Sequence, residues 1–169
     1  MNSRSNISYI NNFVDDDFCN HILDYCKKIE FKKAHQFLNG RRNKEFFFNN
    51  QSLIYNSRIF KKSLLKHDIK LKEWSSPIEI YKYEQSDFIS AHYDSEERFS
   101  NGNISNYTAI LYLNEDFNGG ETFFPELEFS IKPKTGSLLL FEHHILHEAQ
   151  VVNSGCKMIF RSNWLIEKF

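Results

Sequence analysis

Apolar residues recur at two different spacings along this chain, and the change falls near Pro77. In the first part they repeat every three to four residues behind an acidic run, at Phe18, Ile22, Cys26 and Ile29. The acidic residues before this stripe and the lysines at its end both suit the dipole of a helix. The pattern therefore predicts a helix over residues 16–30.

The next segment, residues 31–50, has no apolar periodicity, and Asn39–Lys44 is rich in turn-forming and basic residues. We expect a loop there, either an ordinary surface loop or part of a rim that contacts a substrate. A second helix is predicted over residues 51–65. The residues expected on its inner face are Leu53, Phe60 and Leu64.

Beyond Pro77, apolar and polar residues alternate or form short apolar runs, and both patterns are typical of strands. The predicted strands cover residues 78–83, 88–92, 107–113, 121–124, 129–131, 137–141, 148–152 and 157–166. A turn is expected at 153–155. Residues 95–106 form a polar, glycine-containing loop of a length that is often found in lids and binding loops.

Two helices followed by seven or eight short strands, without the alternation of a parallel βαβ protein, predict a mainly β (α+β) fold. The specific expectation is a double-stranded β-helix, a jelly-roll or cupin-like barrel, with the N-terminal helices packed on its outside. A chain of 169 residues is long enough for one domain with a sizeable core. We expect a single domain over residues 1–169, helical over about 1–75 and a barrel over about 76–169.

Charge, cysteine content and hydropathy bear on the expected partners and cellular location of the protein. The net charge is -1, so no basic surplus indicates nucleic acid as an obligatory partner. Cys19 and Cys26 would lie about 10 Å apart along the first helix, and with Cys156 they predict no disulfide framework. The N-terminus lacks a secretory apolar core, and no apolar run approaches the roughly 20 residues of a membrane span. We therefore expect a cytoplasmic protein without a membrane partner.

The candidate chemistry begins at His92-Tyr93-Asp94, near the end of a predicted strand. Alternate residues of a strand point to the same face, so the imidazole of His92 and the carboxylate of Asp94 can converge on one ion. One more histidine would complete a two-histidine, one-carboxylate triad, which suits iron(II) and leaves coordination positions open. The downstream candidates for this third ligand are His143, His144 and His147.

Several further motifs follow in a characteristic order. They are Tyr83 nine residues before His92, the segment 108–113 (TAILYL), the segment 119–125 (GGETFFP), the turn 133–136 (PKTG), and His147 followed by Gly155 and Lys157 eight and ten residues later. In these motifs the chain resembles the iron(II)- and 2-oxoglutarate-dependent dioxygenases, specifically their prolyl-4-hydroxylase-like branch. The resemblance extends over about residues 76–166.

The resemblance implies that His92, Asp94 and His147 bind the iron. The resemblance does not assign His143 or His144 as an iron ligand, and we expect them at or near the mouth of the barrel.

It also implies a cation for the far carboxylate of 2-oxoglutarate, at Lys157. A buried cation without a partner is costly, so an inward-facing cation on a strand indicates an anionic ligand. Arg161 faces the same side of its strand and has the fork geometry that suits a carboxylate, so it stays an alternative or joint counterion. By the same resemblance, the residues expected to hydrogen-bond the cosubstrate are Tyr83, Thr108 and Tyr112.

The implied cofactors are Fe(2+), 2-oxoglutarate and O2, with ascorbate as an accessory reductant. The implied activity is hydroxylation of an unactivated C–H bond with release of succinate and CO2, and the expected partner is a prolyl residue of a peptide or protein. A free amino acid or small metabolite is an alternative substrate. A non-oxidative cupin-like metal enzyme and a non-catalytic binding module on the same barrel are alternatives from other classes.

Overall fold

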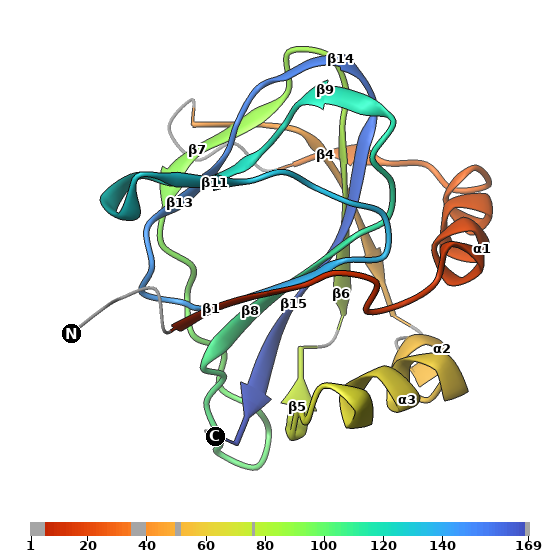
Figure 1. Ribbon diagram of the computed structural model, residues 1–169, viewed down its shortest axis with the longest axis vertical. Helices are drawn as coiled ribbons and strands as arrows, with labels where there is room; N and C mark the ends of the chain where they lie inside the picture. Colours follow the sequence, from red (N-terminus) through yellow and green to blue (C-terminus); the bar gives the residue numbers. More distant parts are fainter. Residues whose placement is uncertain (1–5, 35–39, 50–51, 76, 168–169) are drawn as a thin grey trace.

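Two antiparallel β-sheets form the body of the protein, as Figure 1 shows. The computed structural model describes residues 6–34, 40–49, 52–75 and 77–167. The major sheet has the order β1-β12-β8-β15-β6-β4-β2, with β5 paired to β15. Its strands are β1 (Ile7–Ile10), β2 (Lys32–Lys33), β4 (Lys44–Phe48), β5 (Leu71–Trp74), β6 (Ile78–Tyr83), β8 (Tyr107–Tyr112), β12 (Leu138–Glu142) and β15 (Lys157–Ile166).

The minor sheet lies across from the major one and has the order β11-β10-β13-β7-β3. Its strands are β3 (Arg41–Arg42), β7 (Phe88–His92), β10 (Thr122–Phe124), β11 (Phe129–Ile131) and β13 (His147–Ala149). A two-stranded sheet of β9 (Phe117–Gly119) and β14 (Val152–Gly155) and a 3₁₀ segment, Pro125–Leu127, complete this side. Two facing antiparallel sheets of this kind confirm the expected jelly-roll barrel.

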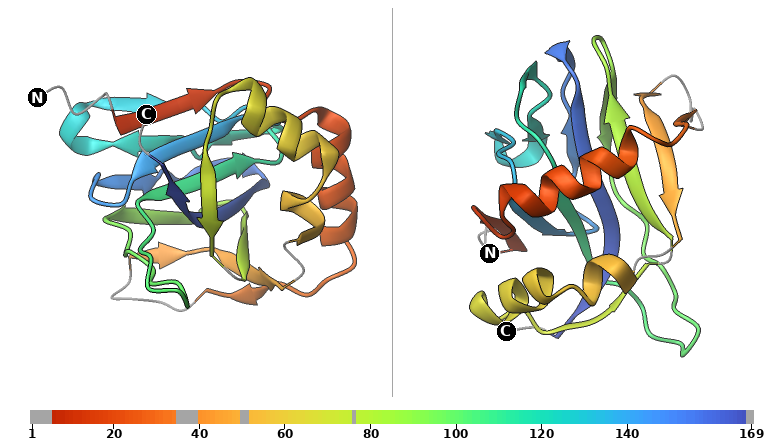
Figure 2. Two further views of the ribbon diagram at one scale, coloured as in Figure 1. Left: turned by 90° about the horizontal axis from the view of Figure 1, so that it is seen from below. Right: turned by 90° about the vertical axis from the view of Figure 1, so that its right-hand side faces the viewer.

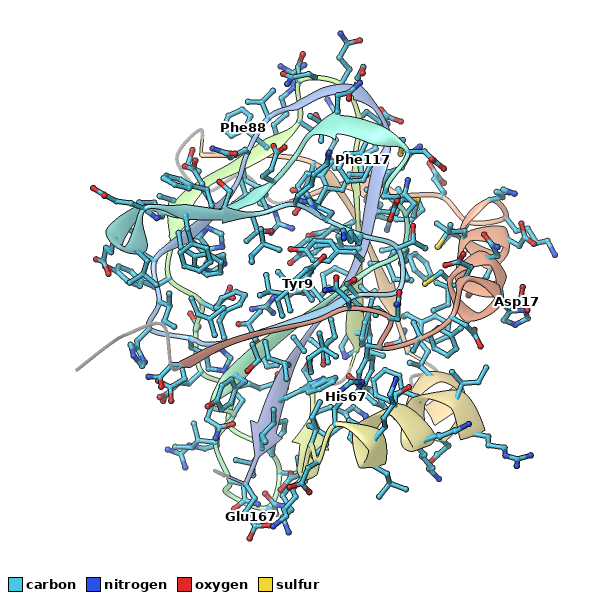
Figure 3. All side chains as sticks on the ribbon, viewed as in Figure 1. Tyr9, Asp17, His67, Phe88, Phe117 and Glu167 are labelled. Carbon is cyan, nitrogen blue, oxygen red and sulfur yellow. The ribbon has the colours of Figure 1, made fainter. Side chains whose placement is uncertain are left out.

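Alternate residues of the major-sheet strands belong to two different cores. Tyr83, Ile110 and Ile159 lie in the cluster between the two sheets. Their neighbours along the chain, such as Leu111 and Phe160, lie in the cluster on the other face, beneath the helices. Because both faces of the sheet are buried, its central strands read as nearly continuous apolar runs. Side chains of both sheets point into the space between them (Figure 3).

The helices cover the outer face of the major sheet, as predicted, and α1 runs across its strands (Figure 2). Helix α1 (Asp16–Cys26) is capped by Asp15, whose carboxylate accepts a hydrogen bond from the backbone N–H of Phe18 at 2.9 Å. The second predicted helix is divided into α2 (Ser52–Tyr55) and α3 (Arg58–Lys66), because Ser57 caps a new helix start. Phe60 is fully buried, as expected, and Leu64 is partly buried against the same core.

The N-terminal part is less helical than we expected. Strands β2, β3 and β4 lie in the segment predicted to be a loop, and β1 and β5 also join the major sheet. The three consecutive phenylalanines of β4 do not alternate with polar residues, so the pattern missed a strand that pairing with β6 defines. The part of Asn39–Lys44 from Gly40 onward is therefore largely strand, while Asn39 falls outside the described residues.

Smaller differences occur near the end of the chain. The predicted strand 148–152 is divided into β13 and β14, and the expected turn at 153–155 belongs to β14. The N-terminal strands share a hydrogen-bonded sheet with strands of the barrel, and a single domain over residues 1–169 stays a prediction. The three cysteines are free thiols. Within the described ranges, no helix is both long and apolar enough to cross a membrane.

Candidate active site

Strand pairing in the minor sheet brings the two distant histidines of the candidate site together. Strands β7 and β13 are antiparallel neighbours, and their register places His92 directly opposite His147, with ring centroids 4.3 Å apart. Asp94 follows β7, and its backbone N–H donates to the carbonyl of His143 at 3.1 Å. The Asp94 carboxylate lies 3.8 Å from His92 Nε2 and 3.5 Å from His147 Nε2. One potential ligand atom from each residue lies within 4.8 Å of the other two.

Both histidines are oriented so that Nε2 faces this cluster. His92 Nδ1 lies 2.8 Å from the carbonyl of Ser90, and His147 Nδ1 lies 3.0 Å from the carbonyl of Ile145. A carbonyl only accepts hydrogen bonds, so Nδ1 carries a hydrogen in each ring and Nε2 is the nitrogen left to bind an ion. Burial also lowers the pKa of His147 to about 4, which keeps this ring neutral at pH 7. Two imidazoles and a carboxylate fit a divalent iron ion.

Two donors hold the Asp94 carboxylate in place. Arg161 Nη2 donates to Oδ1 at 2.9 Å, and the hydroxyl of Thr108 donates to Oδ2 at 2.6 Å. Burial alone would raise the pKa of Asp94, but Arg161, His147 and this hydroxyl together hold the pKa well below its usual range. The group is therefore an ionised carboxylate, and each of its oxygens keeps a second lone pair for an ion.

A chain of hydrogen bonds connects Thr108 to the 95–106 segment. His143 Nδ1 lies 2.9 Å from the Thr108 hydroxyl, and His143 Nε2 lies 2.9 Å from the hydroxyl of Ser105. Since Thr108 donates to Asp94, it must accept from Nδ1–H of His143, which leaves Nε2 to accept from Ser105. Ser105 in turn accepts from the backbone N–H of Glu97 at 2.8 Å. All donors in this chain therefore point toward the candidate metal ligand.

We predict that Thr108→Val weakens metal binding, while Thr108→Ser leaves it nearly unchanged. Valine has the shape of threonine but cannot donate to Asp94, whereas serine can. Loss of a partner that orients a metal ligand lowers affinity by about 10- to 100-fold. The measurement is an anaerobic titration of the apoprotein with Mn(2+) followed by electron paramagnetic resonance. Equal affinities for the two variants would show that the hydroxyl does not orient Asp94.

The cluster opens into a cavity of about 580 Å³, which is lined by residues of both sheets. Lys157 lies in its wall, only 1% exposed, and its Nζ donates to the carbonyl of Gly120 at 2.6 Å. The ammonium group also lies 5.0 Å from the ring centroid of Tyr83 and 5.7 Å from that of Tyr112. Among the described residues, no carboxylate forms an ion pair with it. Burial lowers the pKa of Lys157 to about 7.

Arg161 lines the same cavity but is already neutralised. Besides Asp94 it contacts Glu79, with Nη1 3.0 Å from Oε2, and the hydroxyl of Tyr81 donates to the same carboxylate oxygen at 2.6 Å. Burial would lower the pKa of Arg161, but the two carboxylates raise it. This arginine is therefore permanently charged and engaged on both sides. For Lys157, by contrast, the part of the chain that the structure describes supplies no carboxylate at ion-pair distance, and the charge of Glu121 acts on it only from further away.

Comparison with known proteins identifies the family. Residues 78–165 match the family model of the 2OG-Fe(II) oxygenase superfamily, which is more than half of the chain. The chain belongs to this superfamily. It is 24% identical over 172 residues to the "Putative prolyl 4-hydroxylase" of Acanthamoeba polyphaga mimivirus, covering 89% of this chain and 70% of that protein.

Two solved structures share the fold of this oxygenase. A viral collagen prolyl hydroxylase from Paramecium bursaria Chlorella virus-1, in its 2OG complex, has a TM-score of 0.69 and 21% identity, covering 96% of this chain and 97% of that one. A prolyl hydroxylase from Trichoplax adhaerens, in complex with a peptide fragment of the hypoxia inducible factor oxygen degradation domain, has a TM-score of 0.71 and 16% identity, covering 95% and 83%.

In this oxygenase the remaining predicted site residues have different neighbours. Tyr83 lines the cavity, and the hydroxyl of Tyr112 lies 2.7 Å from that of Thr122, which also lines it. Thr108 lines the cavity as well, but its hydroxyl is engaged with Asp94 rather than free for a cosubstrate. His144 is exposed and pairs with Glu142 at 3.3 Å, away from the three candidate ligands.

Sequence reasoning missed Glu79 as a residue of the site. It lies on β6 four residues before Tyr83, so the alternation of the strand points both side chains into the barrel. A charged residue on the inward face of a strand is unusual, and that signal was available in the sequence. The contact with Arg161, which explains the charge, depends on the pairing of β6 with β15.

Proposed function

We propose that this protein is an Fe(II)- and 2-oxoglutarate-dependent hydroxylase that modifies a prolyl residue of a peptide or protein. The observation that carries the proposal is Lys157, a buried cation with no carboxylate at ion-pair distance among the described residues. It lies in the wall of the cavity that contains the His92, Asp94 and His147 cluster. A dicarboxylate that chelates an ion at the cluster would bring its far carboxylate to this ammonium group. Family membership and the prolyl hydroxylases among its relatives point to the same chemistry.

Each half of the cofactor pair has its own residues. His92, Asp94 and His147 would hold the iron, and Lys157, beside the ring of Tyr112, would hold the far carboxylate of 2-oxoglutarate. Bound iron and 2-oxoglutarate supply the oxidising power to insert one atom of O2 into a C–H bond, with release of succinate and CO2. Ascorbate would act as a reductant that keeps the iron in its divalent state.

The protein contributes orientation and charge. The carbonyls of Ser90 and Ile145 keep the two imidazoles turned toward the ion, and Thr108 with Arg161 keeps the carboxylate in place. Burial within the barrel excludes water from Lys157, so its attraction for a carboxylate is stronger than in solvent.

We assign the role of counterion to Lys157 and not to Arg161. Two carboxylates, Asp94 and Glu79, already satisfy the guanidinium group. Recruiting Arg161 to a cosubstrate would remove a donor from the candidate metal ligand. In this proposal Arg161 therefore fixes Asp94, and Lys157 is free to bind the incoming dianion.

The function is tested by turnover of 2-oxoglutarate with a library of proline-containing peptides. With Fe(2+), O2 and ascorbate present, we expect succinate to form and one peptide class to gain the mass of one oxygen atom. Omission of Fe(2+) or of 2-oxoglutarate should stop both. Formation of succinate without oxidation of any peptide would indicate that the substrate is a free amino acid or small metabolite instead. Absence of any iron-dependent succinate would contradict the oxygenase activity itself.

A further inference from the structure

The strand β15 presents four alternate side chains to the cavity, and the last of them has an unused hydrogen-bonding atom. These residues are Lys157, Ile159, Arg161 and Asn163. Asn163 is 8% exposed, and its Oδ1 is buried without a hydrogen-bond partner among the residues that the structure describes. Since buried polar atoms are nearly always paired, an orphaned acceptor beside a substrate cavity needs an explanation.

The orientation of this side chain follows from its neighbour. Nδ2 of Asn163 lies 3.3 Å from the carboxylate of Glu97, in the 95–106 segment. A carboxylate accepts hydrogen bonds, so the amide nitrogen must face it and the oxygen must be the unpaired atom. The backbone of Asn163 is satisfied, because its N–H donates to the Ser75 hydroxyl at 3.0 Å and its carbonyl accepts from the Ser75 N–H at 2.8 Å. Oδ1 is therefore the atom of Asn163 that lacks a hydrogen-bond partner among the described residues.

The place of Asn163 separates it from the cosubstrate half of the cavity. At a rise of about 3.3 Å per residue, the backbone of Lys157 is about 13 Å from that of Arg161, and Asn163 lies about 7 Å further on in the same direction. Arg161 contacts Asp94, and the cross-strand partner of Asn163 is Thr108, which also contacts Asp94. The candidate metal ligand thus lies between the lysine at one end and the orphaned acceptor at the other.

We propose that Asn163 Oδ1 is a specificity contact for the prime substrate and accepts a hydrogen bond from a peptide backbone N–H. This inference rests on the proposed function, because it takes the substrate to be a peptide. A prolyl residue has no N–H of its own, so the donor belongs to a residue that flanks it. The torsion about the Asn Cβ–Cγ bond is broad, and the contact with Glu97 is long, so Oδ1 can turn toward a donor in the cavity without a change in the backbone.

The test removes the two partners of the proposed hydrogen bond separately and together. A peptide that the wild-type enzyme hydroxylates is resynthesised with one flanking amide replaced by an ester, which lacks the N–H. One such ester should lower kcat/KM by about tenfold, as expected for loss of a hydrogen bond in a buried site. Asn163→Leu should lower kcat/KM for the amide peptide by a similar factor. The ester should then cause no further loss in this variant, because its partner is already absent.

Two further measurements distinguish a contact with substrate from a structural role. Asn163→Leu should retain the wild-type affinities for Mn(2+) and 2-oxoglutarate. Its thermal stability should change little, because Oδ1 loses no bond and the one side-chain contact that is lost is the long hydrogen bond from Nδ2 to Glu97. Asn118→Leu is the matched control, because Asn118 is an exposed asparagine that bonds Ser154 outside the cavity lining. It should leave kcat/KM unchanged.

The outcomes are separable. Independent, multiplicative losses for the variant and for every flanking ester would overturn the inference and leave the prolyl hydroxylase proposal intact. A parallel loss of metal binding, cosubstrate binding and stability in Asn163→Leu would assign the residue to the structure instead. Turnover of 2-oxoglutarate without oxidation of any peptide would overturn both the prolyl proposal and the inference that rests on it.

Discussion

Replacing His147 with alanine should abolish metal binding and lower 2-oxoglutarate turnover by at least about a hundredfold, more than the loss of an orienting partner causes. The substitution removes one of three ligands, and the remaining His92 and Asp94 leave an incomplete site. His147 is buried, and its Nε2 lies 3.5 Å from the Asp94 carboxylate, so the alanine variant loses a ligand atom at the centre of the cluster. Anaerobic Mn(2+) titration and iron-dependent succinate formation are the two measurements.

His144→Ala provides a matched control three residues away. His144 has a side chain that is 74% exposed and pairs with Glu142, so its loss should change metal affinity and turnover less than twofold, roughly the margin of a surface substitution. If instead His144→Ala abolished metal binding while His147→Ala retained it, the choice of ligand among the downstream histidines would be wrong.

Replacing Lys157 with methionine should raise the dissociation constant of 2-oxoglutarate by about a hundredfold and leave Mn(2+) affinity unchanged. A hydrogen bond between charged groups in a buried site contributes up to about 3 kcal/mol, which corresponds to this factor. Methionine keeps the apolar stem between Tyr83 and Tyr112 while removing the charge. Lys82→Met is the control, because Lys82 is the cross-strand neighbour of Met158, is partly exposed, and pairs with Glu84.

The same lysine predicts a pH dependence of cosubstrate binding. Burial lowers the pKa of Lys157 from 10.5 to about 7, so in the free protein the amine is largely neutral at pH 8. Binding of a dianion favours the ammonium form of Lys157. The protein should therefore take up a proton at this amine when 2-oxoglutarate binds. The dissociation constant should rise between pH 7 and 9, by at most about tenfold per pH unit for one coupled proton. Calorimetric titrations in buffers of different ionisation enthalpy measure this uptake.

The stability of the ligand-free protein should depend on pH in the opposite direction to its affinity for 2-oxoglutarate. Between pH 7 and 10.5 the unfolded chain binds a proton at this lysine that the folded, ligand-free protein does not, so this group makes folding more favourable as pH rises through that window. Below pH 7 the buried ammonium destabilises the free protein. Lys157→Met should therefore stabilise the ligand-free protein more at pH 6 than at pH 9. Identical stability changes at both pH values, with a pH-independent affinity for 2-oxoglutarate, would contradict the assignment.

The spacing of apolar residues was sufficient to predict most helices and strands, because it repeats with the period of the helix or strand backbone. Helical spacing from Phe18 to Ile29 predicted the first helix, although α1 ends at Cys26, and period-two runs after Pro77 predicted the barrel strands. The pattern failed at β4, whose Phe46–Phe48 run carries no alternation. It also failed between α2 and α3, where the cap at Ser57 interrupts a continuous apolar stripe. In both cases hydrogen bonding, rather than hydrophobicity, decides the element.

The sequence by itself determined the chemical inventory of the site. His92 and Asp94 share a face because they are two residues apart, and Lys157 and Arg161 share one because their spacing along a strand is even. The resemblance carried by the ordered motifs supplied the family, which the comparison confirms. The assignment of these individual residues to iron and to 2-oxoglutarate stays a prediction that the experiments above test.

Only the tertiary structure decided which of these groups meet. The register between β7 and β13 places His147 opposite His92, a relation between strands more than fifty residues apart that no local period encodes. Pairing of β6 with β15 gives Arg161 the carboxylate of Glu79, whereas no carboxylate of residues 6–34, 40–49, 52–75 or 77–167 forms an ion pair with Lys157. Charge pairing and orphaned atoms are properties of three-dimensional neighbours, and a linear pattern shows which way a side chain points but not what it contacts.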